Sequence, residues 1–446
     1  MIQTSLVNFQ DDFLNVSGKE ISEWGTFKDS LKTPVHNWFT YPAGFSYKAV
    51  IYFLKKYGAQ KGQTIYDPFM GSGTTNLVAK SLGFNSYGVE AHPFVFPITQ
   101  AKMDWEIDVD EAKKHFLKIK NKFNASKEKG QKIELVEVPE LLHKCYEVET
   151  LEDLIRLRDI VNSASKDKIE KNLFFVALVA LLREVSLAAT GWPYIAPKKI
   201  KSSSIGKIVI NEYEKLVNRM LNDILTIRES SVSDYKKSKH EIFLGDCRDT
   251  TKIIEKNVAD FIFTSPPYLN NFDYADRTRL EMYFFGEANT WGDISSAVRE
   301  RLMTSATTQI NRSDDKYILN KDIKDTNKKL YANLQNIITQ LAAIRQTKGG
   351  KKSYDLLVAG YFNDMHNQLR DSFRILKSEG VASYVLGDSA PYGVHVQTDV
   401  LLGEMAKAIG FSSYTIEELR ARGGKWKDNP QRHSVPLRET IVTLRK

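Results

Sequence analysis

A strand, a glycine turn, a helix and a second strand follow one another within residues 64–90, and this order is the feature that most constrains the fold. The run Thr64-Ile65-Tyr66-Asp67 predicts a buried strand, and the turn spans Gly71 to Gly73. A helix is predicted through Leu82, and a second strand at Ser86–Glu90. Such a unit is half of a doubly wound α/β sheet, in which a ligand binds at the carboxyl ends of the strands.

The turn itself reads Asp67-Pro68-Phe69-Met70-Gly71-Ser72-Gly73-Thr74-Thr75. Because Gly71 and Gly73 carry no side chains, the backbone can pass close to a ligand there. The spacing is neither that of a phosphate-binding loop ending in Lys-Ser/Thr nor Gly-x-Gly-x-x-Gly. A pyrophosphate cofactor is therefore not favoured.

Two acidic residues follow other strands of the predicted sheet. Glu90 lies about twenty residues after Gly71, where an acid in doubly wound folds accepts hydrogen bonds from ribose hydroxyls. Asp246 follows the predicted strand Ile242–Leu244 and could receive the amino group of an adenine. A ribose, an adenine and a small polar tail describe S-adenosylmethionine. The alternative is that Asp67 and Asp246 only cap helices or turns.

A second motif, Thr264-Ser265-Pro266-Pro267-Tyr268, directly follows the predicted strand Ala259–Phe263. An exocyclic amine on cytosine or adenine is a poor nucleophile, because its lone pair is delocalised into the ring. The Ser265 hydroxyl and the Pro266 carbonyl would accept the hydrogens of that amine, and two consecutive prolines keep the carbonyl rigidly aimed. Tyr268 offers a flat face on which an extruded base can stack. The alternative, a proline-rich surface turn, is disfavoured by the apolar strand before the motif.

This chemistry needs little acid–base catalysis, because the methyl donor is already a sulfonium cation. The rate should come from in-line positioning and electrostatics. A base inside a duplex cannot present its amine to the cofactor, so the base would have to be flipped out. No Pro-Cys dipeptide occurs, which argues against methylation of carbon 5 through a cysteine nucleophile.

These motifs resemble one known family. Asp67–Thr75 is similar to the cofactor loop of the S-adenosylmethionine-dependent DNA amino-methyltransferases, and Asn37–Phe45 resembles the segment that closes over the methionine end of the cofactor. Thr264–Tyr268 looks most like the enzymes that methylate the N4 amine of cytosine, with N6-adenine enzymes as the alternative. The catalytic residues that we predict are Ser265, Pro266, Pro267 and Tyr268. The predicted cofactor contacts are Tyr41, Ala43, Phe45, Asp67, Phe69, Gly71, Gly73, Thr74, Thr75, Glu90, Asp246 and Thr264.

The resemblance implies a seven-stranded, doubly wound, Rossmann-like core with S-adenosylmethionine as cofactor and double-stranded DNA as substrate. It also implies a restriction–modification system, in which a cognate restriction endonuclease is the functional partner. Arg438-Glu439-Thr440-Ile441 is similar to the closing segment of the family. Asp388 would end a strand near the catalytic one and support the pocket, unless it lies in an ordinary strand-end turn.

Changes in composition divide the chain into five parts. They are 1–100, a lead-in and the cofactor half of the core; 101–240, a helical insertion; 241–285, the core with the catalytic motif; 286–352, a polar surface insertion; and 353–446, the C-terminal part of the core. Relatives in which the loop comes first usually carry target recognition after the strand that ends at Asp246. Here one large block precedes that strand and another follows the catalytic motif, so both insertions are candidates for reading DNA.

The candidate DNA contacts combine basic residues with aromatic neighbours, which can grip phosphates or wedge a duplex. They are Trp192, Tyr194, Lys198, Lys199 and Lys201, together with Asn270, Tyr274 and Arg277 after the catalytic tyrosine. The loop of Gly423 and Gly424 beside Lys425, Trp426 and Lys427 is a further candidate. The alternatives are a solvated lysine-rich face and a plain surface turn.

The overall composition fits a nucleic-acid partner in a reducing compartment. A formal charge of +8 and a pI of about 9.0 favour phosphate binding, although charge alone does not decide it. The two cysteines and the scattered histidines lack disulfide or metal-ligand spacing, so we expect no metal site. No long apolar run and no secretion signal are found, which predicts a cytoplasmic protein without a membrane span.

Two rival functions use the same motifs. An RNA base methyltransferase would have a similar pocket, but no appended RNA-binding module is recognisable. A non-catalytic DNA-binding subunit would keep only the fold, and the intact Gly71, Gly73, Ser265, Pro266 and Tyr268 argue against it.

Overall fold

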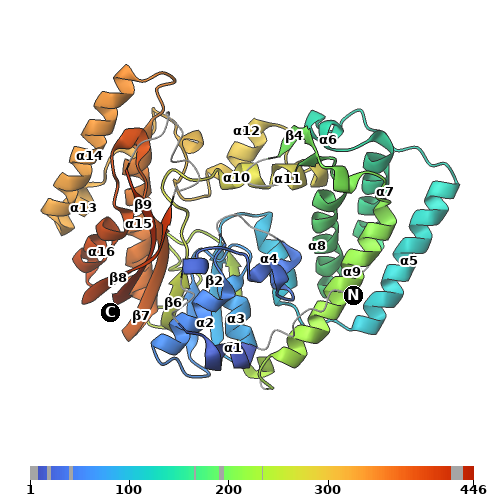
Figure 1. Ribbon diagram of the computed structural model, residues 1–446, viewed down its shortest axis with the longest axis horizontal. Helices are drawn as coiled ribbons and strands as arrows, with labels where there is room; N and C mark the ends of the chain where they lie inside the picture. Colours follow the sequence, from blue (N-terminus) through green and yellow to red (C-terminus); the bar gives the residue numbers. More distant parts are fainter. Residues whose placement is uncertain are drawn as a thin grey trace.

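A seven-stranded, mainly parallel sheet forms the centre of the protein in a computed structural model (Figure 1). The structure describes residues 9–17, 22–39, 44–164, 167–189, 195–233, 235–422 and 435–446. The strands of the central sheet are β1 (Thr64–Asp67), β2 (Asn85–Glu90), β5 (His240–Leu244), β6 (Ala259–Thr264), β7 (Leu376–Gly387), β8 (Ser413–Arg422) and β9 (Leu437–Arg445). A separate two-stranded sheet pairs β3 (Ala188–Ala189) with β4 (Ala196–Ile200).

The strand order is β5-β2-β1-β6-β7-β9-β8. β1 pairs in parallel with β2 on one side and with β6 on the other, and only β9 runs against its neighbours β7 and β8. The direction of winding therefore reverses between β1 and β6, and a crevice opens there at the carboxyl ends of the strands. This confirms the predicted doubly wound α/β fold with seven strands.

Alternate residues of each central strand face opposite sides of the sheet. Ile65, Phe261 and Phe263 join one buried apolar cluster, whereas Tyr66 and Ile262 join the other. Because both faces of these strands are buried, they read as continuous apolar runs in the sequence. The sequence patterns predict β1, β2, β5, β6 and β9 within a few residues of their observed bounds. For β7 they predict only 381–386, whereas the strand begins at Leu376.

Helices cover both faces of the sheet. The first face is covered by α1 (Phe9–Asn15), α2 (Tyr47–Lys56), α3 (Thr74–Leu82) and α4 (Val95–Met103). The second face is covered by α13 (Lys321–Thr326), α14 (Lys328–Thr347), α15 (Tyr354–Ile375) and α16 (Thr398–Ile409). Between them in the chain, α10 (Tyr274–Arg277), α11 (Arg279–Phe285) and α12 (Trp291–Ile294) span the top of the view in Figure 1. No helix of the described residues is apolar over a length that could span a bilayer.

Five helices between α4 and β5 form a lobe beside the sheet, seen at the right of Figure 1. It contains α5 (Val109–Glu128), α6 (Glu140–Cys145), α7 (Val148–Ala164), α8 (Lys168–Val185) and α9 (Val209–Ser230). α8 is the apolar helix expected at 173–187, and its buried side chains pack against α4, α7 and α9. Asp108 and Asp167 cap the first turns of α5 and α8 by accepting two backbone N–H bonds each.

Two elements differ from what the sequence predicted. The polar stretch 286–352 was expected to be a surface insertion, but it contains the long helix α14, which buries Leu334 and Leu341 against α15. β8 was not predicted at all. It is an edge strand with a mainly polar sequence, and such strands carry a weak apolar signal because little of their surface is buried.

Candidate active site

A pocket lies at the carboxyl ends of β1, β2, β5 and β6, where the winding of the sheet reverses. About 90 Å³ of it is free interior space, and the wider hollow, with solvent at its open mouth, measures about 850 Å³. It brings together segments far apart in the sequence: 44–45, 68–74, 89–91, 245–247, 265–267, Tyr274 and 301–303. Of the predicted cofactor contacts, Phe45, Phe69, Gly71, Thr74, Glu90 and Asp246 line this pocket.

The glycine loop needs glycine at two positions, Gly71 and Gly73. Both have positive φ angles, 52° at Gly71 and 84° at Gly73, in the left-handed region that other residues avoid. A Cβ on Gly73 would also lie 2.7 Å from Thr99 Cγ2 of α4. Thr99 Oγ1 donates to the Gly71 carbonyl at 2.7 Å, so α4 holds the loop in this conformation.

A buried lysine supports the same loop from below. Lys102 of α4 donates from Nζ to the Ser72 carbonyl at 2.6 Å. Burial lowers the pKa of Lys102 to about 7. This contact could not be predicted from the sequence, since a lysine near the end of a helix normally points to solvent.

Glu90 lies at the end of β2 and reaches across the loop. Its carboxylate accepts the Gly71 N–H at 2.8 Å and the His92 N–H at 2.7 Å, one on each oxygen. Burial raises the pKa of Glu90 to about 7, and the two backbone donors oppose that shift. The group lines the pocket, with lone pairs left over for further donors.

Asp67 lies beneath the pocket rather than on its wall. Its Oδ1 accepts the Thr264 hydroxyl at 2.6 Å and the Phe69 N–H at 3.1 Å, which joins the end of β1 to the end of β6. Thr75 makes a second link, from its hydroxyl to the Phe263 carbonyl at 3.1 Å. Burial raises the pKa of Asp67 to about 6. These residues tie the glycine loop to the strand that carries the second motif.

Asp246 lines the pocket at the end of β5, where it pairs with an arginine that the sequence reasoning missed. Arg248 donates from Nε to Asp246 Oδ1 at 2.9 Å and from Nη2 to Oδ2 at 2.6 Å. The Asp246 side chain is still 47% exposed, so its oxygens can reach a ligand as well.

The Ser-Pro-Pro-Tyr motif begins on the wall of the same pocket. Ser265 and Pro267 line it, and Ser265 Oγ donates to the Val385 carbonyl of β7 at 3.3 Å. That bond is at the long end of the usual range, so the hydroxyl is weakly held. The loop and the motif, about 190 residues apart in the chain, thus open into one cavity.

Tyr268 lies behind this wall and is buried. Its hydroxyl donates to Glu439 Oε1 of β9 at 2.7 Å, and Arg420 of β8 donates to the other oxygen of Glu439 at 2.6 Å. Arg422 lies over the ring with its guanidinium carbon 5.2 Å from the centroid. One face of the ring on which a base was expected to stack is therefore covered by an arginine of this chain.

A second, polar cavity lies on the other side of the motif. Its wall includes Asn270, Lys352 and Arg422. Asp388, at the end of β7, also lines it and accepts from His395 Nε2 at 2.7 Å and from the Arg438 N–H at 2.7 Å. The motif thus separates the first pocket from a basic and amide-rich cavity.

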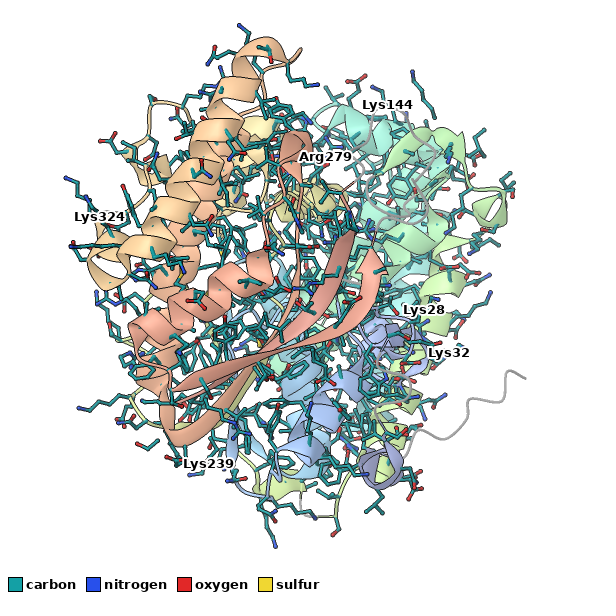
Figure 2. All side chains as sticks on the ribbon, turned by 60° about the vertical axis from the view of Figure 1, so that its left-hand side comes forward. Lys28, Lys32, Lys144, Lys239, Arg279 and Lys324 are labelled. Carbon is teal, nitrogen blue, oxygen red and sulfur yellow. The ribbon has the colours of Figure 1, made fainter. Side chains whose placement is uncertain are left out.

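The other predicted contacts fall in different places. Tyr41, Ala43, Trp192, Tyr194 and the 423–427 loop lie outside the described residues. Lys198 and Lys199 are exposed on β4, whereas Lys201 donates to the carbonyl of Arg183 at 3.0 Å. Tyr274, a predicted DNA contact, lines the first pocket although little of it is exposed, and Arg277 is buried. In Figure 2, Lys28 and Lys32 are labelled near each other, whereas Lys144, Lys239 and Lys324 lie on other parts of the molecule.

The pocket also has a wall that sequence reasoning missed. Arg301, Leu302 and Met303 come from the polar stretch 286–352 and line the pocket opposite the β-strand ends. The local sequence could not predict their position at the pocket, because it depends on how the loop that carries them folds back to the sheet.

Comparisons with known proteins agree with this geometry. Residues 12–101 match the family described as DNA methylase. M.BsoBI, a Type II methyltransferase of Geobacillus stearothermophilus, is 26% identical over 94% of this chain and 87% of its own length. M.AvaI, a Type II methyltransferase of Nostoc sp. strain PCC 7120, is 22% identical over 94% of this chain and 88% of its own length. M.MjaII of Methanocaldococcus jannaschii is 36% identical over only 25% of this chain and 21% of its own length.

Proposed function

We propose that this protein transfers a methyl group from S-adenosylmethionine to an exocyclic amine of a base in DNA. The matches described above confirm the resemblance of the chain to the DNA amino-methyltransferases. The preferred target is the N4 amine of cytosine. The biological setting that we propose is protection of cytoplasmic host DNA in a Type II restriction–modification system, as the names of the relatives suggest.

One observation carries this proposal. The glycine loop after β1 and the Ser-Pro-Pro-Tyr motif after β6 are joined by the hydrogen bond from Thr264 to Asp67, at 2.6 Å, and both line one pocket. A methyl donor held by the loop would thus lie beside acceptors for an amine. A protein that bound only the cofactor, or only the base, would not need the glycine loop and the Ser-Pro-Pro-Tyr motif to lie side by side.

The pocket offers hydrogen-bond acceptors for the hydroxyl and amino groups of the cofactor. Glu90 would accept the ribose hydroxyls, and Asp246 the amino group of the adenine. Phe45, Phe69 and Met303 supply apolar walls for a flat ring system. The left-handed turn at Gly71 and Gly73 lets the backbone approach the amino-acid end without crowding. When bound, the cofactor supplies an electrophilic methyl group on a sulfonium.

The Ser-Pro-Pro-Tyr motif would prepare the amine. Ser265 Oγ and the Pro266 carbonyl would each accept one N–H of the amine, which draws the nitrogen lone pair out of the ring and toward the methyl. Holding the amine in line is the main source of rate, because reaction geometry alone can contribute several kcal/mol. Tyr268 would stack on the base after Arg422 has left its ring.

The choice of base rests on the motif rather than on the pocket. Ser265 stands where N6-adenine enzymes more often carry Asp or Asn, so cytosine N4 is favoured and adenine N6 is the alternative. The geometry of the described residues is compatible with either amine.

Single-molecule sequencing of genomic DNA from cells that express the protein tests the proposal. We expect N4-methylcytosine at one short sequence, and no modification in cells that express Ser265→Ala. N6-methyladenine at one sequence would change the target base but keep the reaction. Methylation of transfer RNA with unmodified DNA would favour the RNA alternative and contradict the proposal.

A further inference from the structure

Arg248 stands between two carboxylates that belong to different parts of the molecule. On one side it forms the two-pronged pair with Asp246, on the wall of the cofactor pocket. On the other side its Nη1 donates to Asp364 Oδ1 of α15 at 2.8 Å. The guanidinium fork can hold both acids at once, which a lysine cannot do with the same geometry.

Asp364 also binds the 301–305 segment, which contributes to the pocket wall. Its second oxygen, Oδ2, accepts the backbone N–H of Thr304 at 2.8 Å. Thr304 directly follows Arg301–Met303, the residues that line the pocket on that side. Asp364 itself does not line that pocket. Its position therefore affects the cofactor only through its neighbours.

The next residue of the same segment reaches the target side of the site. The carbonyl of Ser305 accepts the backbone N–H of Asn270 at 2.9 Å. Asn270 follows the catalytic motif by two residues, has a positive φ of 57°, and lines the second cavity. A chain of hydrogen bonds and adjacent residues thus runs from Asp246 through Arg248, Asp364 and the 301–305 segment to Asn270.

We propose that Arg248 and Asp364 are positioning residues that couple cofactor binding to DNA binding. The inference rests on the proposed function, because it takes Asp246 as the acceptor for the adenine. When the adenine amino group hydrogen-bonds to Asp246, it competes with Arg248 for the carboxylate oxygens. Arg248 then pairs more strongly with Asp364, and Asp364 holds the 301–305 segment against the pocket. That segment then fixes Asn270 at the mouth of the base site, so each ligand favours the conformation that the other binds.

The experiment measures the affinity of the full-length protein for a duplex that contains its methylation sequence, with and without S-adenosylhomocysteine. The ratio of the two dissociation constants is the coupling factor. We expect about fivefold or more for the wild type, as is typical of coupled sites. Asp364→Ala should bring the ratio close to one. Arg248→Lys should do the same, because it keeps the charge but loses the fork.

Asp371→Ala is the matched control. Asp371 lies on the same helix and is more deeply buried, with its side chain 5% exposed against 14% for Asp364. It pairs with Arg374 and with the Thr250 hydroxyl, and neither of these partners belongs to the 301–305 segment. We expect this variant to lose stability and to keep the coupling factor. A general loss of stability would lower both affinities without changing their ratio.

The outcomes separate this inference from the proposed function. A wild type that binds and methylates DNA with a coupling factor of one, or an Asp364→Ala variant that keeps the wild-type factor, overturns the relay and leaves the methyltransferase intact. A wild type that binds no S-adenosylhomocysteine overturns both. Loss of coupling in Asp371→Ala to the same degree would show that any damage to α15 suffices, which also contradicts the relay.

Discussion

The two halves of the candidate site differ in how ready they are for a ligand. On the cofactor side, Glu90, Thr99 and Lys102 hold the glycine loop by bonds to its backbone, and the pocket is open. On the target side, the ring of Tyr268 is buried under Arg422. One half is preformed, whereas the other is occupied by a side chain of the protein itself.

This difference suggests how the two substrates are treated. A preformed pocket binds a small cofactor with little ordering cost. In the proposed reaction, Arg422 would keep this face of Tyr268 out of water until a flipped base replaces it. Each of the following predictions separates one half of the site from the other.

The largest effect is expected for Ser265→Ala. Loss of one of two acceptors for the amine should reduce the rate of methyl transfer by about a hundredfold to a thousandfold, comparable to removal of one preorganised hydrogen-bonding group in other enzymes. The affinity for the cofactor should change less than about twofold, because the Ser265 hydroxyl bonds weakly to the Val385 carbonyl of β7 rather than to the glycine loop. Single-turnover kinetics and calorimetric binding measure the two quantities. A parallel loss of both would contradict the separation of the halves.

The second effect concerns the cofactor half. Gly73→Ala places a Cβ 2.7 Å from Thr99 Cγ2 at a φ of 84°, so the loop must move. We expect the affinity for S-adenosylmethionine to fall about tenfold or more, since the left-handed conformation alone costs about 1–2 kcal/mol for other residues.

Gly58→Ala is the control for that variant. Gly58 also has a positive φ, 66°, but a Cβ there meets no atom within 4 Å. It should cost stability without changing cofactor affinity. Equal cofactor affinities in the two variants would show that the loop conformation is not needed for binding.

The third effect follows from the raised pKa of Glu90, about 7. Only the carboxylate can hold both backbone donors and accept ribose hydroxyls, so cofactor affinity should fall as the pH is lowered through 7, approaching tenfold per unit well below it. Stability should change in the opposite direction. Because the folded-state pKa is above the ordinary value of 4.5, the free energy of unfolding of the cofactor-free protein should fall as the pH rises from about 5 to 7.5.

Calorimetric titrations at pH 6, 7 and 8 in two buffers of different ionisation enthalpy test this behaviour. Cofactor binding near pH 6.5 should release protons in the wild type. Glu90→Gln should bind more weakly, with an affinity that hardly changes over this range. A wild-type affinity that is independent of pH would exclude Glu90 as the ribose acceptor.

The parts of this site that could be predicted from the sequence are those with a local signal. The buried strands were visible as apolar runs, and the residues directly after β1, β2, β5 and β6 were visible as glycine, acidic and proline motifs. A doubly wound fold then dictates that these strand ends share one edge. The fold and the meeting of the two motifs followed from this rule.

The missed residues act only through tertiary neighbours. Lys102, Arg248 and Arg422 are ordinary cations in the sequence, and their roles depend on carbonyls, acids and a ring brought from other elements. The 301–303 wall was missed for the same reason. Tyr274 and Arg277 are predicted DNA contacts because they follow the motif. Tyr274 does line the pocket, but α10, which begins at Tyr274 and ends at Arg277, leaves both residues largely buried.

The smallest effect is expected for Arg422→Ala, and it bears most directly on the covered half of the site. A cation over an aromatic ring contributes about 0.5–2 kcal/mol, which a flipped base must overcome before it can stack on Tyr268. The preference for a duplex with the target base over the same duplex with an abasic site should therefore rise about threefold to tenfold in the variant. Contacts of Arg422 with phosphates common to both duplexes cancel in this ratio. A preference that falls instead would mean that Arg422 holds the flipped base in place, and the arginine would then belong to the bound state of the site rather than to its closed state.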